Sequence, residues 1–382
     1  MARPKEKTTI CESGIVSLSF SADNKRAAFS PNNHMVYIAE CGPNFTDCTT
    51  WKIVSTLERH DHPVTSVDWS PVNDSILTCS QDRTAYVWKE DAAKKEWIPS
   101  MVMLDTAVTK GATACSWSAN GTKVYFGSAG GNVVVGAYDA ANDWWHCKGI
   151  DKHTSTVTSL APHPTVHTLL ASGGQDGMVF LSSTLTKAAD GKPADVPKFG
   201  TIISELPLRA WVHDLTWNPL GTVLAAATHD SRVTLFTFPS STLHTDPAVE
   251  NVTLRSLPLR SIRFISPTQL IGGGFDFMAM LFAANEKGEK WSLKGQWIAE
   301  AAAKRAKTEA ELAREKFQNQ ASTGQAAAVE LPTTRHKNVI NTISVLKSSD
   351  VAVSLTSSEL LFATASMDGR VEYWDLKSVV VA

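Results

Sequence analysis

The stretch HDHPVTSVDWSPVNDSILTCSQDRTAYVWK, residues 60–89, contains three strand-like segments separated by turns. VTSVDW alternates in polarity and ends at a Ser-Pro turn. SILTCS follows this turn, and a Gln-Asp turn then leads into TAYVW. Short alternating segments bounded by such turn residues are typical of β-strands in an antiparallel sheet. These residues therefore predict a compact three-stranded unit.

The same order of strand, turn, strand, Asp-containing turn and strand occurs six more times in the chain. Its turn markers recur about every 45 to 55 residues from Asp82 to Asp276, slightly above the usual period of the WD repeat, which these units resemble. Asp368 follows only after a much longer interval, which indicates an inserted segment. The other copies span residues 14–40, 112–138, 153–183, 211–238, 261–284 and a last unit that begins at His336 and closes at 360–375.

Stacking of such units explains why they repeat. A four-stranded blade cannot bury both of its faces alone, whereas radial stacking buries them and leaves only short edges. We therefore predict an all-β, seven-bladed WD-repeat β-propeller with a helical insertion between blades 6 and 7, in a single domain over residues 1–382. The predicted parts are a closing strand at 1–13, blades 1 to 6 at 14–284, a helix-containing insertion at 285–335 and blade 7 at 336–382.

Polar residues of the repeat have a predicted structural role. In WD repeats, a His before the first strand, a Ser or Thr, the Asp of the turn and a Trp in the third strand form a hydrogen-bonded chain. Copies three, five and six lack the His, and in copy four Phe180 or Leu181 replaces the Trp. We expect these groups to be buried and hydrogen-bonded and to take no part in catalysis. The residues assigned to this role are His60, Asp82, Trp88, His153, Asp176, Asp230, His336, Asp368 and Trp374.

Composition excludes several classes of protein. The formal net charge is −2, which argues against a nucleic-acid partner because such proteins usually carry a basic excess. No run of about 18 apolar residues and no apolar leader is present, so we expect an intracellular protein without membrane insertion. The six cysteines form no CxxC pair. We expect Cys79 and Cys115 to be buried as small apolar residues, and no metal at Cys41 and Cys48.

Motifs for catalysis are not apparent. The runs IGGGF and SGGQDG lack the ending of a phosphate-binding loop, and neither a GxSxG nor an HExxH motif occurs. His163 and His167 are expected to be solvated on a turn. We therefore predict no catalytic residue, no metal and no cofactor. Four tryptophans lie outside the positions that the repeat requires and are candidate interface anchors: Trp144, Trp145, Trp291 and Trp297.

The insertion has a different composition from the blades. AEAAAKRAKTEAELAREKFQNQ is rich in strong helix formers, and Thr308 with Glu311 has the pattern of a capping box. Such a helix carries only one large aromatic residue, Phe317, and is a poor candidate for core packing. Two interpretations remain open, a surface loop and a recognition helix that presents Phe317 to a partner.

Beyond the repeats, the chain resembles the WD-repeat subunit of the actin-related-protein (Arp) complex, which nucleates branched actin filaments. The resemblance covers most of the chain and lies in VTSVDWSP with TCSQDRTAYVW, NDWWHCK, WVHDLTW, AREKFQN, HKNVINTISVL and MDGRVEYWD. Generic WD repeats share neither NDWW nor the AREKFQN segment at this place in the ring.

The resemblance implies a non-catalytic scaffold subunit in the cytoplasm, at the actin cytoskeleton and cell cortex. Its implied partners are the other subunits of the Arp complex, the mother actin filament and nucleation-promoting factors. The implied filament contact lies in the insertion, where Gln320 departs from the apolar residue expected after the motif. The candidate partner-binding residues are Leu312, Ala313, Arg314, Lys316, Phe317 and Asn319.

Two other functions were considered. A substrate receptor of a ubiquitin ligase often has an Arg two residues after the WD dipeptide, whereas here Trp374-Asp375 is followed by Leu376 and Lys377. An enzyme on a propeller would need acid, base or metal-binding groups that converge at the mouth of the ring, and the sequence offers no such motif.

Overall fold

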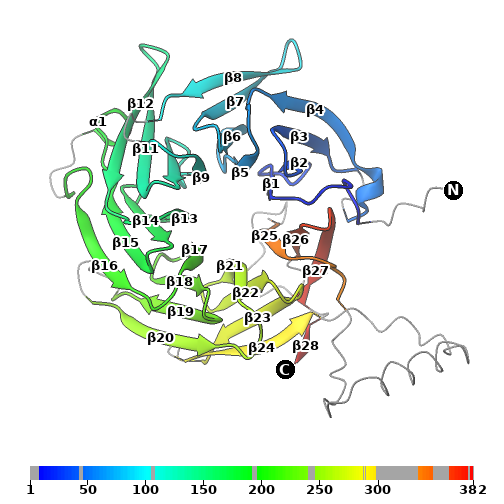
Figure 1. Ribbon diagram of the computed structural model, residues 1–382, viewed down its shortest axis with the longest axis vertical. Coiled ribbons are helices and arrows are strands. Elements are labelled where there is room, and N and C mark those ends of the chain that lie inside the picture. Colours follow the sequence, from blue (N-terminus) through cyan, green and yellow to red (C-terminus); the bar gives the residue numbers. More distant parts are fainter. Residues whose placement is uncertain are drawn as a thin grey trace, which may run out of the picture.

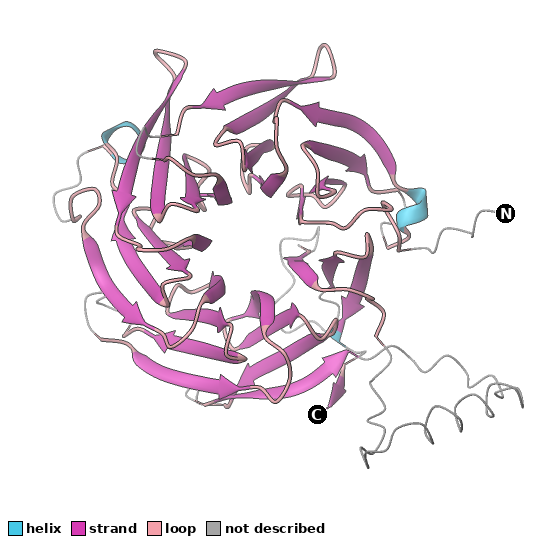
Figure 2. Ribbon diagram, in the orientation of Figure 1, coloured by secondary structure: helices cyan, strands magenta, loops and turns pink. Residues whose placement is uncertain are grey.

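Seven small antiparallel sheets form a ring around a central opening (Figures 1 and 2). The computed structural model describes residues 8–42, 46–104, 108–191, 196–239, 246–286, 288, 290–297, 334–346, 361–376 and 379–381. The predicted seven-bladed β-propeller is confirmed. The insertion helix lies outside the described residues.

Strands follow one another from the centre of the ring to its rim within each blade (Figure 1). The first strands, next to the opening, are β1 (Ser17–Phe20), β5 (Val64–Trp69), β9 (Ala112–Trp117), β13 (Val157–Pro162), β17 (Val212–Trp217), β21 (Leu259–Ser266) and β25 (Ile340–Val345). The second strands are β2 (Arg26–Ser30), β6 (Ser75–Ser80), β10 (Lys123–Ser128), β14 (Leu169–Gly174), β18 (Val223–Thr228), β22 (Gln269–Gly274) and β26 (Leu361–Ser366).

The third strands of the blades are largely buried, whereas fourth strands such as Lys52–Glu58 and Ala248–Thr253 are mostly exposed. The third strands are β3 (Met35–Glu40), β7 (Ala85–Asp91), β11 (Asn132–Asp139), β15 (Met178–Ser183), β19 (Arg232–Thr237), β23 (Ala279–Ala284) and β27 (Val371–Asp375). The fourth strands are β4 (Lys52–Glu58), β8 (Glu96–Val102), β12 (Trp144–Asp151), β16 (Ile202–Pro207), β20 (Ala248–Thr253) and β24 (Trp291–Trp297). The described helices are short: η1 (Cys48–Thr50) and α1 (Lys187–Asp190).

The hydrophobic core lies between the blades. Seven buried apolar clusters occur among the described residues, and each one joins two neighbouring blades. The second strands β6, β10, β14 and β18 are buried along their whole length, because both of their faces pack on a neighbouring blade. Cys79 and Cys115 lie in the cluster between blades 2 and 3, as predicted.

Ring closure involves both ends of the described chain. Thr9 forms an antiparallel bridge with Arg370, and the N–H of Val371 donates to the carbonyl of Thr8 at 2.8 Å. The N-terminal segment thus lies beside β27, where its described residues pair through one bridge. Residues 1–7 of the predicted strand at 1–13 lie outside the described residues. A last strand, β28 (Val380–Val381), pairs with the outer edge of β24, so blade 6 has five strands.

The remaining edge of blade 7 is covered by side chains. The Trp297 indole donates to the Asp375 carbonyl at 2.8 Å, and the Arg335 guanidinium donates to the Tyr373 carbonyl at 3.4 Å. Since β24 belongs to blade 6, with Trp291 and Trp297 buried, the segment between the blades starts after Trp297. The predicted boundary at residue 285 was therefore too early, because the Lys- and Gly-rich turn before β24 has the composition of a linker.

Candidate functional site

The hydrogen-bonded chain of the repeat is complete in blade 2. The His60 Nδ1 lies 2.8 Å from Thr84 Oγ1 and 3.3 Å from Asp82 Oδ2. On the other side of the imidazole, His60 Nε2 lies 2.9 Å from Thr78 Oγ1. Thr78 Oγ1 also accepts a hydrogen bond from Trp88 Nε1 at 3.0 Å. The structure thus brings His60, Asp82 and Trp88 together through two threonines.

Blade 7 repeats this arrangement with one looser contact. The His336 Nε2 is 2.7 Å from Thr364 Oγ1, to which Trp374 Nε1 donates at 2.8 Å. The His336 Nδ1 is 3.5 Å from Asp368 Oδ1, beyond a well-formed hydrogen bond. Asp368 also accepts the N–H of Lys337 at 2.6 Å, so its carboxylate orders the loop that enters the blade.

Blades 4 and 5 have partial versions. His153 Nδ1 lies 2.9 Å from Asp176 Oδ2, and the Phe180 ring packs edge-on at 4.7 Å from the His153 ring, as the Tyr86 ring does against His60 in blade 2. Ser182 takes the place of Trp88, because it pairs with Leu170 as Trp88 pairs with Ile76. The predicted replacement of the Trp by Phe180 or Leu181 was therefore wrong. Asp230 in blade 5 has no such histidine: it accepts from Thr228 Oγ1 and pairs with Arg232 Nε at 3.3 Å.

Burial sets the charge state of these groups. Burial lowers the pKa of His60 although Asp82 favours the charged ring, and the same holds for His153 beside Asp176. Burial acts to raise the pKa of Asp82, but hydrogen bonds from Thr84 and from the backbone of Asp61 outweigh it and lower that pKa. Neutral imidazoles bonded on both nitrogens stabilise the turns and are not available for proton transfer.

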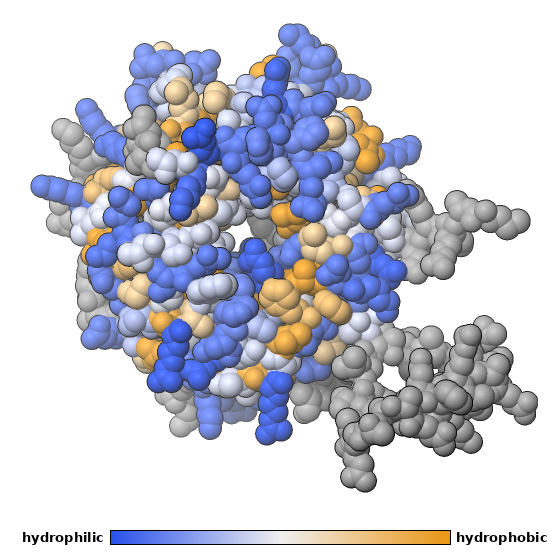
Figure 3. Space-filling view, in the orientation of Figure 1, coloured by the Kyte–Doolittle hydropathy of each residue, from blue (hydrophilic) through white to orange (hydrophobic). Residues whose placement is uncertain are grey.

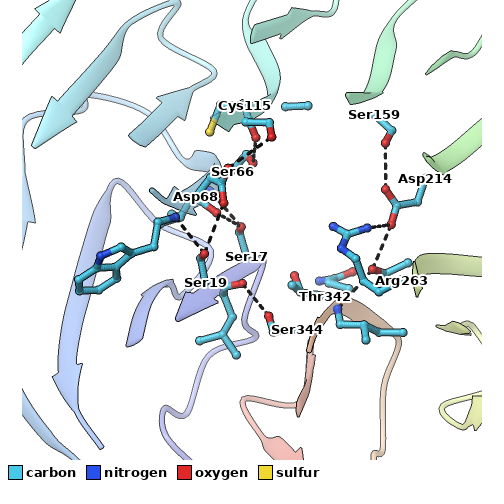
Figure 4. Close-up of a pocket in the computed structure, with 18 of the residues that line it drawn as sticks. Ser17, Ser19, Ser66, Asp68, Cys115, Ser159, Asp214, Arg263, Thr342 and Ser344 are labelled. Atoms are coloured by element: carbon cyan, nitrogen blue, oxygen red, sulfur yellow. Dashed lines mark hydrogen bonds and ion pairs between the residues drawn. The ribbon is translucent and has the colours of Figure 1, made fainter. Parts of the chain in front are cut away.

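The central channel has polar walls formed by the first strands (Figure 4). It encloses a cavity of about 450 Å³. Its side chains join blades whose first strands share no backbone ladder. Ser17 accepts the N–H of Val67 at 3.0 Å between blades 1 and 2, and Asn341 donates to the carbonyl of Ile15 at 2.9 Å between blades 7 and 1.

Two aspartates of the channel wall, the half-buried Asp68 and the buried Asp214, link neighbouring blades. Asp68 accepts the N–H of Trp117 at 2.8 Å between blades 2 and 3. Asp214 accepts Ser159 Oγ of blade 4 at 2.9 Å and, from blade 6, the N–H of Ile262 at 2.9 Å. Burial raises the pKa of Asp68, and the hydrogen bond from Trp117 opposes that shift. Sequence reasoning missed these residues, although Ser66 and Asp68 among the apolar residues of VTSVDW were a usable signal.

The polar side chains of the channel wall hold neighbouring blades together. Asp214 also binds Arg263 Nη1 at 2.7 Å, and the Arg260 Nη1 donates to the His213 carbonyl at 3.1 Å. The carboxylates of Asp68 and Asp214 are therefore already bonded to hydrogen-bond donors of the channel wall. Within the described part of the chain, no three His, Cys, Asp or Glu side chains gather in a way that could hold a metal ion.

Other candidate residues are placed differently from expectation. Of the four additional tryptophans, only Trp144 is exposed, at 47%, whereas Trp145, Trp291 and Trp297 are buried between blades. His163 is buried and not solvated: its Nε2 lies 2.9 Å from the Gly221 carbonyl. Six candidates, Leu312, Ala313, Arg314, Lys316, Phe317 and Asn319, lie outside the described residues.

Comparison with known proteins agrees with this architecture. The family model described as WD domain, G-beta repeat, matches residues 51–89 and 145–181. A ring of seven such blades defines a WD-repeat β-propeller. None of the helices within the described ranges is long and apolar enough to cross a bilayer.

Full-length relatives narrow this class. The actin-related protein 2/3 complex subunit 1A of Arabidopsis thaliana is 33% identical over 381 residues, covering 96% of this chain and 95% of the relative. Subunit 1A-B of Xenopus laevis is 30% identical over 374 residues, with the same coverage. Subunit 1 of Schizosaccharomyces pombe is 35% identical over 249 residues, which is 63% of this chain and 64% of the relative. The chain belongs to the family of subunit 1 of the actin-related protein 2/3 complex.

Proposed function

We propose that this protein is a scaffold subunit of the actin-nucleating Arp complex. In this role it supports filament nucleation and branching through contacts with the other subunits, with the mother filament and with nucleation-promoting factors, in the cytoplasm and at the cell cortex. The observation that carries the proposal is the similarity to the named relatives, which runs along nearly the whole of both chains.

The residues that flank the insertion support the proposal that the propeller holds the insertion out as a contact for a partner. Before it, the Trp297 ring packs edge-on at 4.9 Å from the Phe362 ring in the seam between blades 6 and 7. After it, the Arg335 guanidinium lies 4.6 Å from the centre of the Trp374 ring. Both points of attachment are therefore anchored on the same seam. The proposed filament contact is made by Leu312, Ala313, Arg314, Lys316, Phe317 and Asn319.

Deletion of residues 298–333, with a short Gly-Ser link from Trp297 to Thr334, tests whether the propeller alone assembles with the complex and the insertion makes the filament contact. The boundaries keep β24 and its two buried tryptophans, which a deletion from residue 290 would remove. We expect the variant to copurify with the other Arp subunits and to give few branches in a filament-branching assay. Loss of copurification, or normal branching by the assembled variant, would contradict the proposal.

Phe317→Ala is the corresponding point test. An aromatic anchor contributes about 1–3 kcal/mol to an interface, so its removal should weaken filament attachment by roughly 5- to 150-fold. Gln318→Ala, at the next residue, is the matched control and should leave branch density unchanged. Equal branch densities for the two variants would remove Phe317 from the contact. Recovery of ubiquitin-ligase adaptors in place of actin-related proteins would refute the scaffold role itself.

A further inference from the structure

Blade 5, at the lower left of Figure 1, lacks most of the hydrogen-bonded chain of the WD repeat. In blades 2, 4 and 7 the histidine of that chain lies four residues before the first strand, where blade 5 has Leu208. The hydroxyl that bonds to the histidine, that of Thr78 in blade 2, corresponds by register to Ala226. The ring that packs on the histidine, that of Tyr86 in blade 2, corresponds to Thr234. Blade 5 therefore has neither the histidine, nor its hydroxyl partner, nor the aromatic ring.

A cavity of about 210 Å³, the blade 5 pocket, lies where these groups are missing. It is lined by Leu208 and Arg209 of the segment that enters the blade, by Arg232 and Thr234 of β19, and by Asn251 of β20. Because Thr234 has no ring, the space that an aromatic side chain fills in blades 2 and 4 is left open. The pocket therefore follows from the degeneration of the repeat in this blade.

Nitrogen donors from three segments line the pocket. Arg232 Nε is buried and has no hydrogen-bond partner among the described residues, although Asp230 Oδ2 lies 3.3 Å away. Thr234 Oγ1 donates to Asn251 Oδ1 at 2.7 Å, so the amide nitrogen of Asn251 remains a donor. Arg209 is exposed and adds a second guanidinium. A buried donor without an acceptor is unfavourable, and a ligand oxygen at Arg232 would remove that cost.

The charges of the pocket favour an anion. Arg209 and Arg232 carry two positive charges and Asp230 carries one negative charge, which leaves a net charge of +1. Asp230 is already bonded, because Thr228 Oγ1 donates to it. Exposed charged residues are common on the ring, as the hydrophilic colouring of Figure 3 shows, so Arg209 alone would indicate no site. The cavity and the buried, unpaired Arg232 Nε set this place apart.

We propose that the blade 5 pocket binds a phosphate group. A phosphate monoester presents three terminal oxygens in a tetrahedral arrangement, which suits donors on three segments, whereas a planar carboxylate has only two oxygens. Guanidinium groups bind phosphate through parallel N–H bonds. The pocket is smaller than the about 300–1,000 Å³ of sites for drug-sized ligands, so it has room for the phosphate group and little more. This inference is independent of the proposed function.

Titration of the full chain with inorganic phosphate tests the site, by calorimetry in chloride buffer at constant ionic strength. We expect saturable binding, weakened at least tenfold by Arg209→Gln and by Thr234→Phe. The first variant removes one charge, and the second fills the pocket with the ring that Phe180 supplies in blade 4, without a change of charge. Arg255→Gln is the matched control, because Arg255 is an exposed arginine in the segment that enters blade 6, outside the pocket. It should bind phosphate as the unsubstituted chain does.

Thermal unfolding checks that each variant keeps its fold. Arg209→Gln, at an exposed side chain, carries the test if Thr234→Phe loses its transition. The source of the phosphate is distinguished with N-acetyl-O-phosphoserine amide: tighter binding than that of inorganic phosphate assigns a phosphorylated side chain, and equal or weaker binding assigns a free phosphate, each at the same site. The assignment is overturned if the unsubstituted chain shows no saturable binding, if Arg209→Gln binds phosphate as tightly, or if Arg255→Gln loses as much.

Discussion

Lys123 lies in an environment that is unusual for a lysine, because its side chain is fully buried. Its ammonium is fully buried and lies 2.8 Å and 3.0 Å from the two oxygens of Asp190, in the short helix α1. It also donates to the Thr184 carbonyl at 3.2 Å. Burial lowers the pKa of Lys123, and Asp190 opposes that shift. This ion pair connects blade 3 to the loop of blade 4. The sequence around Lys123 gives no indication of a partner so far along the chain.

Lys123→Met should destabilise the fold strongly, because it leaves the carboxylate of Asp190 buried without its counter-charge. Breaking a buried pair from one side costs about 3–5 kcal/mol. Lys152→Met, which breaks an exposed pair with Glu205, should cost less than about 1 kcal/mol. Urea unfolding measures both. Similar midpoints for the two variants would show that the buried pair contributes little.

At the scale of elements, the seam between blades 7 and 1 depends on a turn that requires glycine. Gly369 has φ +77°, and a Cβ there would lie 2.1 Å from the carbonyl oxygen of Cys11 in the N-terminal segment. The carbonyl of Gly369 in turn accepts the N–H of Ile10 at 3.0 Å. Any side chain at this position would therefore displace the segment that closes the ring.

Gly369→Ala should lower the free energy of unfolding by more than the backbone strain alone, which is about 1–2 kcal/mol for a left-handed alanine. Gly200→Ala provides the control, with φ +78° and no atom within 4 Å of the added Cβ. The difference between the two variants in chemical denaturation isolates the contact with Cys11. If both lose the same amount, the N-terminal segment does not stabilise the ring.

Prediction from sequence succeeded where the repeat is local. The strands, their turns and the His60–Asp82–Trp88 chain follow from residues within one unit. Prediction from sequence failed where a side chain of one blade packs against or bonds to the neighbouring blade. Trp297 looks like part of a linker in the sequence, and only the packing against blade 7 shows why it is buried. His163 likewise looks solvated until Gly221 of the next blade is placed beside it.

For the whole molecule, buried histidines set the response to acid. Burial lowers the pKa of His60, His153 and His163, and it lowers that of His213, beside Arg260, to about 4. In the unfolded chain each of these rings binds a proton near pH 6.5. Below that pH the unfolded state therefore binds more protons than the folded state, and stability falls as the pH falls.

The free energy of unfolding should accordingly decrease from pH 6.5 to 4.5, by at most about 1.4 kcal/mol per pH unit for each such histidine. Below about pH 4, loss of the carboxylate charge on Asp82 and Asp368, whose pKa values are lowered by hydrogen bonds, adds to the decrease. Urea titrations at several pH values measure the slope. A flat profile would mean that these rings protonate without unfolding.

The short pairings at the two ends of the described chain have a mechanical consequence. The segment around Thr9 is held on blade 7 by one bridge and a few backbone hydrogen bonds, and Val380–Val381 is held on the neighbouring blade 6 by a two-residue ladder. Tension applied between handles at these ends is carried first by those few hydrogen bonds and not by the four-stranded blades. In an optical trap the first rupture should therefore be a low-force detachment of the ends, and the blades should then unfold from the seam between blades 7 and 1.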